Sequence, residues 1–166
     1  MARNVRLLGV TGNLFDDPRI TAVGLLFEAH SALAARFSAQ LAGHGLSQVE
    51  FEVLIRLARS PDQRLRMTDL AAQTALSTSG ITRVVDRLER DGLVARRACS
   101  SDRRISYAMV TTAGLDRLNE VLPGHLELIE QWFTGQFSAE RLDELLDALR
   151  TVRDALRPEA TAGAHR

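Results

Sequence analysis

The sequence predicts a mostly α-helical fold with one small β-hairpin, and three observations carry that prediction. Apolar residues recur at helical spacing over most of the chain, capping residues divide the helices sharply, and two strand-like segments flank a polar, arginine-rich stretch. The 166 residues, 45% hydrophobic and 25% charged, are enough for one compact core and too few for two ordinary domains.

The N-terminal part of the chain predicts an arm followed by a long helix. Residues 1–16 are too apolar for a solvated tail, so we expect them to pack as an N-terminal arm. Asp16-Asp17-Pro18 is typical of a helix start, because a carboxylate caps free amides and proline fits the first turn. The helix is expected to fill residues 17–45 and to end at Gly43 and Gly45.

Residues 46–111 predict a lobe in which three further helices are followed by two strands. The last two of these helices are short and closely spaced, as in a helix-turn-helix, and the strands enclose a charged tip at residues 98–104, as in a wing. The expected caps and stops are, in chain order, Ser47 with Glu50, Ser60-Pro61, Thr68-Asp69, Ala75, Ser77 and Gly92, and the strands are Leu93-Val94 and residues 105–111.

The C-terminal part predicts two more helices and a tail. Residues 112–157 keep helical spacing, first through Phe137 with a kink at Pro123, then in an amphipathic segment capped by Ser138. Residues 158–166 hold almost nothing to bury and are expected to be disordered.

The outer helices carry more apolar surface than a small winged core can cover. The natural cover for such stripes is a second copy of the chain. We therefore expect N- and C-terminal dimerisation helices, at residues 17–45 and 112–157, and an obligate homodimer.

Charge is balanced overall but segregated along the chain. The 21 basic residues, all arginine, equal the 21 acidic residues, so overall basicity does not argue for a nucleic-acid partner. Residues 93–104 nevertheless hold a local excess of positive charge, made by Arg96, Arg97, Arg103 and Arg104 against Asp102.

The helix that starts at Ser77 has the features of a DNA-reading helix. Small hydroxyl side chains at its start allow close approach to DNA, and its free amides favour a phosphate. Arg83, one turn further on, can reach a guanine edge or a phosphate. A simple cap and a solvated arginine are the alternative interpretation. The candidate DNA-binding residues on this helix are Ser77, Thr78, Ser79, Thr82, Arg83 and Arg87.

The predicted wing adds a second group of candidates. An arginine pair at the end of such a hairpin can insert into the electronegative minor groove, which predicts that role for Arg103 and Arg104. Asp102 is placed to orient the Arg104 guanidinium. An ordinary polar turn is the alternative.

These residues resemble the MarR-type regulators over residues 20–156. The resemblance is carried by Leu70-Ala71, Ser77 through Arg83, Asp86 to Glu89, Gly92 to Val94, and the wing pattern of Asp102, Arg104, Val110 and Thr111. It implies a dimeric winged helix-turn-helix regulator with the Ser77 helix in the major groove and Arg103 or Arg104 in the minor groove. Val110-Thr111 stands where Leu-Thr is usual, and Thr78 where proline is common.

Regulation is open at the level of sequence. The resemblance implies a small organic effector, an anion or a phenolic compound, with His30 a weak candidate contact because it lies near where the family builds its effector cavity. Cys99 offers a redox switch instead, since Arg96 and Arg97 beside it can lower a thiol pKa. The family's thiol sensors, however, carry their cysteine near the N-terminus.

Other classes of function find little support in the sequence. We expect no enzyme and no cofactor, because no phosphate loop, His-Glu-x-x-His motif or paired carboxylates are present, and no metal, because the four histidines lack ligand spacing. A winged-helix protein-interaction module is the remaining alternative. One cysteine, and the lack of a signal or spanning segment, predict a cytoplasmic protein that binds double-stranded DNA and no membrane.

Overall fold

The computed structural model describes residues 13–98 and 105–161. The chain divides into two compact units, residues 1–36 and 37–166, and each is described by itself. Most of the expected N-terminal arm, the tip of the wing and the last five residues lie outside the described part.

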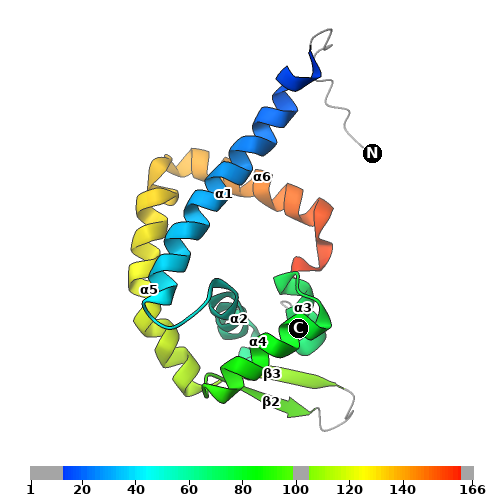
Figure 1. Cartoon of the computed structure of the whole chain (residues 1–166), viewed down its shortest axis with the longest axis vertical. Helices are drawn as coiled ribbons and strands as arrows, with labels where there is room; N and C mark the ends of the chain where they lie inside the picture. Colours follow the sequence, from blue (N-terminus) through cyan, green and yellow to red (C-terminus); the bar gives the residue numbers. More distant parts are fainter. Residues whose placement is uncertain (1–12, 99–104, 162–166) are drawn as a thin grey trace. The chain divides into compact units, whose positions relative to one another are not determined.

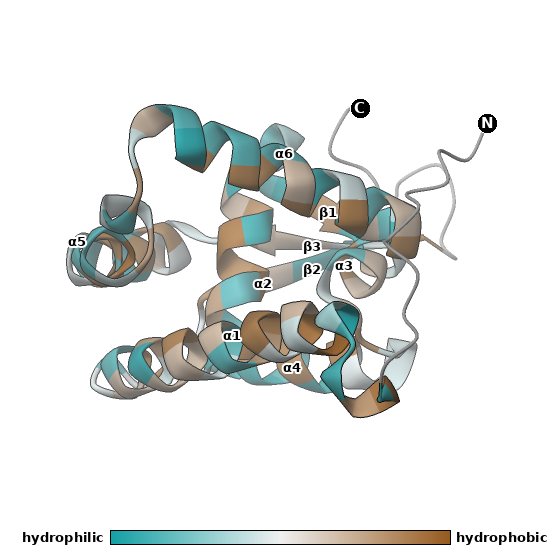
Figure 2. Ribbon diagram, turned by 90° about the horizontal axis from the view of Figure 1, so that it is seen from above, coloured by the Kyte–Doolittle hydropathy of each residue, from teal (hydrophilic) through white to brown (hydrophobic). Residues whose placement is uncertain are grey.

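The first unit contains a short 3-10 turn, Leu14–Asp16, and most of helix α1 (Pro18–Ala42). The start at Pro18 confirms the prediction, and the carboxylate of Asp17 accepts hydrogen bonds from the backbone amide of Arg19 at 2.9 Å and from its Nε at 2.8 Å. These bonds lower the pKa of Asp17 to about 2. Apolar side chains along α1, such as Ile20 and Phe27, stay exposed. Figure 2 shows apolar residues of α1 as brown segments of the ribbon.

Helix α1 also differs from one expectation. By length and composition it is apolar enough to cross a membrane, whereas the sequence was expected to hold no such segment. None of the apolar stretch that qualifies is buried among the described residues, and a signal sequence near the N-terminus passes the same test of length and composition.

The second unit contains the predicted lobe (Figure 1). Its helices are α2 (Gln48–Arg59), α3 (Met67–Thr74) and α4 (Thr78–Arg90). The Ser47–Glu50 capping box is present, with the Ser47 amide donating to Glu50 Oε2 at 2.8 Å. Helix α3 begins before the expected Thr68-Asp69 cap and has no side-chain cap, because a strand leads straight into it.

A three-stranded antiparallel sheet replaces the expected two-stranded hairpin. Strands β2 (Val94–Ala98) and β3 (Ser106–Val110) pair as predicted, although β2 extends beyond Leu93-Val94, and β1 (Arg64–Arg66) adds to the other edge of β3. Leu65 opposite Ala108 places two apolar side chains on the inner face, where both are buried.

The core of the lobe is formed by side chains from α2, α3, α4 and the inner face of the sheet. Its fully enclosed members include Leu54, Leu70, Ile81 and Leu88. This core holds the helix-turn-helix and the base of the wing as one packed body.

The chain continues through α5 (Thr112–Trp132) and α6 (Ala139–Leu156). Helix α5 ends before the expected Phe137, because a 3-10 turn, Thr134–Gln136, reverses the chain. A Cβ on Gly135 would lie 2.5 Å from the Glu130 carbonyl oxygen, so this tight turn needs glycine. Ser138 precedes α6, but its side chain makes no capping bond to the helix amides.

The start of the expected disordered tail is ordered. Pro158–Thr161 forms a 3-10 turn, η4, and Ala160 is buried there. The sequence does not show this because the partners of η4 lie on α2 and α3.

Candidate nucleic-acid interface

The first turn of α4 presents exposed hydroxyl groups. Ser77 caps the helix by accepting from the Gly80 amide at 3.1 Å, and its Oγ lies 3.1 Å from that of Ser79. Thr82 donates to the Thr78 carbonyl oxygen at 2.7 Å. The structure thus brings these predicted residues together on an exposed helix start, where amides and small side chains can meet a phosphate backbone.

Arg83 and Arg87 both lie on α4 but differ in whether their guanidinium groups have a partner among the described residues. Within residues 13–98 and 105–161, the exposed Arg83 guanidinium makes no hydrogen bond or ion pair. Arg87 instead pairs with Glu50 of α2, with Nη1 at 3.1 Å from Oε1. Arg87 therefore holds α4 against α2, and Arg83 is available to an outside partner.

Glu50 stays ionised in this position. Burial alone raises the pKa of its carboxyl, but hydrogen bonds from Ser47 and the charge of Arg87 outweigh burial and hold the pKa below its ordinary value. The carboxylate thus caps α2 and anchors α4 with one charge.

Arg96 has partners that the sequence did not indicate. It was counted in the positive excess of residues 93–104, but its guanidinium turns back onto α4. Nη1 pairs with Asp86 and lies 3.3 Å from Glu89 Oε2, and Nη2 donates to the Thr82 carbonyl oxygen at 3.0 Å. Arg96 fixes the recognition helix to the wing, so its charge is already neutralised.

The outer face of the sheet carries a second basic group. Tyr107 lies opposite Arg66 on one side and Arg97 on the other. The Arg64 guanidinium lies 5.2 Å from the centre of the Tyr107 ring, and Arg66 Nε donates to the Tyr107 hydroxyl at 3.4 Å. These positive charges lie at the base of the wing.

The wing tip itself is outside the described residues. Asp102, Arg103 and Arg104, and the candidate redox residue Cys99, all fall there. Their predicted roles therefore stay predictions.

A cavity of about 590 Å³ lies between α2 and α5. Its lining is mostly apolar, with Phe51 and Leu122 among its members and Arg59, Asn119 and His125 as its polar ones. The predicted ligand contact, His30, is exposed in the first unit, and the cavity presents His125 instead.

A hydrogen bond and two ring contacts hold His125 in one orientation. Gln40 Nε2 donates to the Val121 carbonyl oxygen at 3.1 Å, which leaves Gln40 Oε1 to accept from His125 Nδ1 at 3.0 Å. The rings of Phe37 and Phe51 lie against the imidazole. Burial lowers the pKa of His125, so the ring is neutral and its Nε2 is an acceptor.

Metal chemistry has no site in the described residues. No group of three or more histidine, cysteine, aspartate or glutamate side chains there could hold an ion.

The described elements form a winged helix-turn-helix with an exposed α4, the fold of transcriptional regulators that bind DNA and are not enzymes. The sequence profile of the MarR family matches residues 46–106. The chain is 34% identical to the transcriptional repressor YetL of Bacillus subtilis over 68% of this chain and 71% of that one. The chain therefore belongs to the MarR family.

Solved structures agree with this assignment. Sco3205, a MarR family regulator from Streptomyces coelicolor solved in complex with DNA, superposes with a TM-score of 0.80 at 31% identity, over 86% of this chain and 93% of that one. CouR from Rhodococcus jostii, solved with p-coumaroyl-CoA, superposes with a TM-score of 0.71 at 25% identity, over 86% of this chain and 95% of that one.

Proposed function

We propose that the protein is a homodimeric, ligand-responsive repressor that binds a pseudopalindromic operator in double-stranded DNA. The single observation that carries this proposal is the state of Arg83. The neighbouring arginines Arg87 and Arg96 are consumed by ion pairs that hold α4 in place, while Arg83 extends unpaired, among the described residues, from a hydroxyl-lined helix start. Because such a regulator acts on the chromosome, we place it in the cytoplasm.

In this proposal α4 enters the major groove. Ser77, Thr78, Ser79 and Thr82 approach the phosphate backbone, and Arg83 donates to a guanine edge. Arg87 contributes chiefly by orienting the helix through Glu50. The wing follows the backbone to the minor groove, where Arg103 or Arg104 inserts and Asp102 orients the arginine.

The outer helices supply the dimer contact. Apolar side chains on α1, such as Phe27 at 64% exposed, and on α6, such as Leu156 at 76%, are left uncovered by residues 13–98 and 105–161. A second copy covers them and places two recognition helices on one DNA face, roughly 34 Å apart.

The cavity between α2 and α5 is the proposed effector site. Its apolar walls suit an aromatic ring, Nε2 of His125 can accept from a phenolic hydroxyl, and Arg59 at the lining can bind a carboxylate. A ligand that favours one spacing of the recognition helices weakens operator binding by the factor by which DNA weakens ligand binding.

Replacement of Arg83 tests the DNA-reading role. Operators selected from a random duplex library supply a panel with single base-pair changes. Arg83→Ala should cost about 1–3 kcal/mol on the best operator and should flatten discrimination at one base pair of each half-site. Arg90→Ala, which removes an exposed arginine from the last turn of α4, is the matched control and should keep that discrimination.

An equal loss of affinity on all sequences would indicate that Arg83 contacts a phosphate and does not read a base. Equal, weak and salt-insensitive binding by wild type to every duplex would contradict DNA regulation and favour a protein-interaction module.

A further inference from the structure

We propose that Arg157 is a positioning residue that ties the C-terminal helix α6 to the helix-turn-helix, through a C-terminal latch made of residues 157–160. The contacts of the latch stand on their own. Their consequence for operator binding rests on the proposed function.

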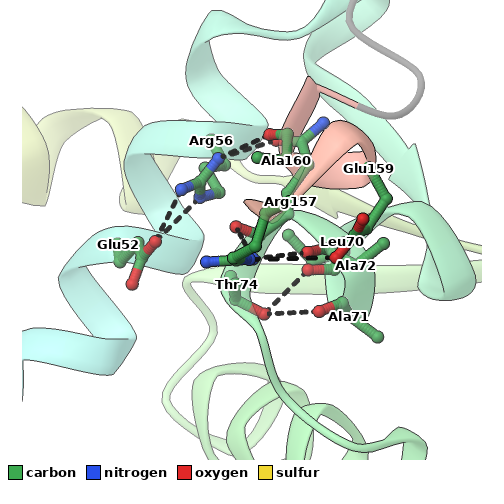
Figure 3. Close-up of polar contacts among 10 residues, drawn as sticks. Glu52, Arg56, Leu70, Ala71, Ala72, Thr74, Arg157, Glu159 and Ala160 are labelled. Carbon is green, nitrogen blue, oxygen red and sulfur yellow. Dashed lines mark hydrogen bonds and ion pairs between the residues drawn. The ribbon is translucent and has the colours of Figure 1, made fainter. Parts of the chain in front are cut away.

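Arg157 binds backbone carbonyl groups at the C-terminal end of α3 (Figure 3). Its Nη2 donates to the carbonyl oxygen of Ala72 at 2.7 Å and to that of Gln73 at 3.2 Å. Both carbonyls belong to the last turn of α3, where few helical amides remain to satisfy them. A guanidinium there also complements the negative end of the helix dipole.

A second arginine holds the same segment from α2. Arg56 Nη1 donates to the Ala160 carbonyl oxygen at 3.4 Å and to Gln73 Oε1 at 3.2 Å. Glu52 fixes Arg56 in turn, with its Oε1 accepting from Nη2 at 2.7 Å and from Nε at 3.0 Å. Ala160 is 7% exposed, so the latch is packed as well as hydrogen-bonded.

The latch acts next to the turn that positions α4. After Thr74 the backbone of Ala75 takes φ +56°, and the Leu76 amide returns to the Ala71 carbonyl oxygen at 3.1 Å. Ser77, the cap of α4, follows directly. Fixing the end of α3 therefore fixes the start of the recognition helix.

Helix α6 depends on this attachment. None of its residues is fully buried, and its firmest contact with the lobe among the described elements runs through η4. A shift of α6 is thus transmitted to α3, and in a dimer it changes the separation of the two recognition helices.

Hydrogen exchange, followed by mass spectrometry on the full-length protein without DNA, tests the latch itself. Arg157→Ala should speed exchange at the amides of Ala75 and Leu76 by about three- to tenfold, which is the scale of one lost hydrogen bond. Arg157→Lys should fall between wild type and the alanine variant, because an ammonium group replaces only part of the planar donor set.

Arg150→Ala is the matched control, since Arg150 lies on α6 and its one ion pair among the described residues is with Asp147 of the same helix, at 2.6 Å. It should leave these amides unchanged. Unchanged exchange in Arg157→Ala, or an equal rise throughout the chain, would overturn the latch whatever happens on DNA.

Half-site spacing supplies the readout that a merely structural role would not move. The Arg157→Ala variant should bind the operator with the preferred half-site spacing about three- to tenfold more weakly than wild type. Its affinity for operators lengthened or shortened by one base pair should be unchanged, so its preference for one spacing should be smaller. Equal loss on all spacings would overturn the positioning role. If wild type binds every duplex equally and weakly, the proposed function fails, while the exchange result still decides the latch.

Discussion

The lobe and the outer helices differ in how far their apolar side chains are buried. In the lobe, Leu54, Ile81 and Leu88 are 0% exposed. On α1, by contrast, Ile20 and Phe27 are more than half exposed, and α6 buries no residue fully. Leu41 of α1 and Val121 of α5 join the core of the lobe, whereas other apolar side chains of α1 and α6 stay exposed among the described residues. This difference is the basis for proposing that the lobe binds DNA and that the outer helices associate.

A core substitution in the lobe should give the largest effect. Leu54→Ala deletes a fully enclosed side chain and should lower the free energy of unfolding by about 2–5 kcal/mol. Urea unfolding measures it, and the loss should be the same at every protein concentration. Leu156→Ala, at an exposed position, should stay within about 0.5 kcal/mol in the dissociated chain. Equal losses would erase the contrast between the two regions.

An outer-helix substitution should act through association. Phe27→Ala removes an aromatic side chain that we expect a second copy to bury, and it should weaken the dimer by about ten- to 100-fold. Light scattering over a dilution series measures this change. Ser31→Ala, an exposed polar position on the same helix, is the control. Wild-type protein that has the 18.3 kDa mass of one chain at every concentration of the dilution series, and that still binds its operator, would contradict the dimer.

The smallest expected effect concerns pH and the ionised cap in the lobe. Because the folded-state pKa of Glu50 lies below its ordinary value, its stabilisation is present in full above that value and is lost as pH falls through the folded pKa. Glu50→Gln should cost about 0.5–2 kcal/mol at pH 7. The difference in free energy of unfolding between variant and wild type, measured with urea, should become smaller as pH falls below about 4.5. A gap that is the same at neutral and acid pH would assign no role to the charge.

Local signals in the sequence predicted most of the fold. The Ser47–Glu50 box, the Ser77 cap and the strands beside the wing depend on residues close together in the chain, and the structure contains all three. Strand β1 was missed because Arg-Leu-Arg has no strand composition, and it forms only because the free edge of β3 accepts it.

The errors at the candidate site have the same origin. Arg96 was counted as uncompensated positive charge in residues 93–104, because its partners, Asp86 and Glu89, lie on a different element. Arg157 was expected only as the last residue of the C-terminal helices, and its contacts were missed because the carbonyls that it binds are on α3. A composition count registers a charge but not the group that neutralises it.

The most direct test of the account is selection of bound sequences from a random duplex library by the full-length protein, followed by footprinting of the best sequence. The account predicts a pseudopalindrome whose half-sites lie about one helical turn apart, with protection on one face of the DNA. An enriched sequence without two-fold symmetry, or no enrichment at all, would contradict it.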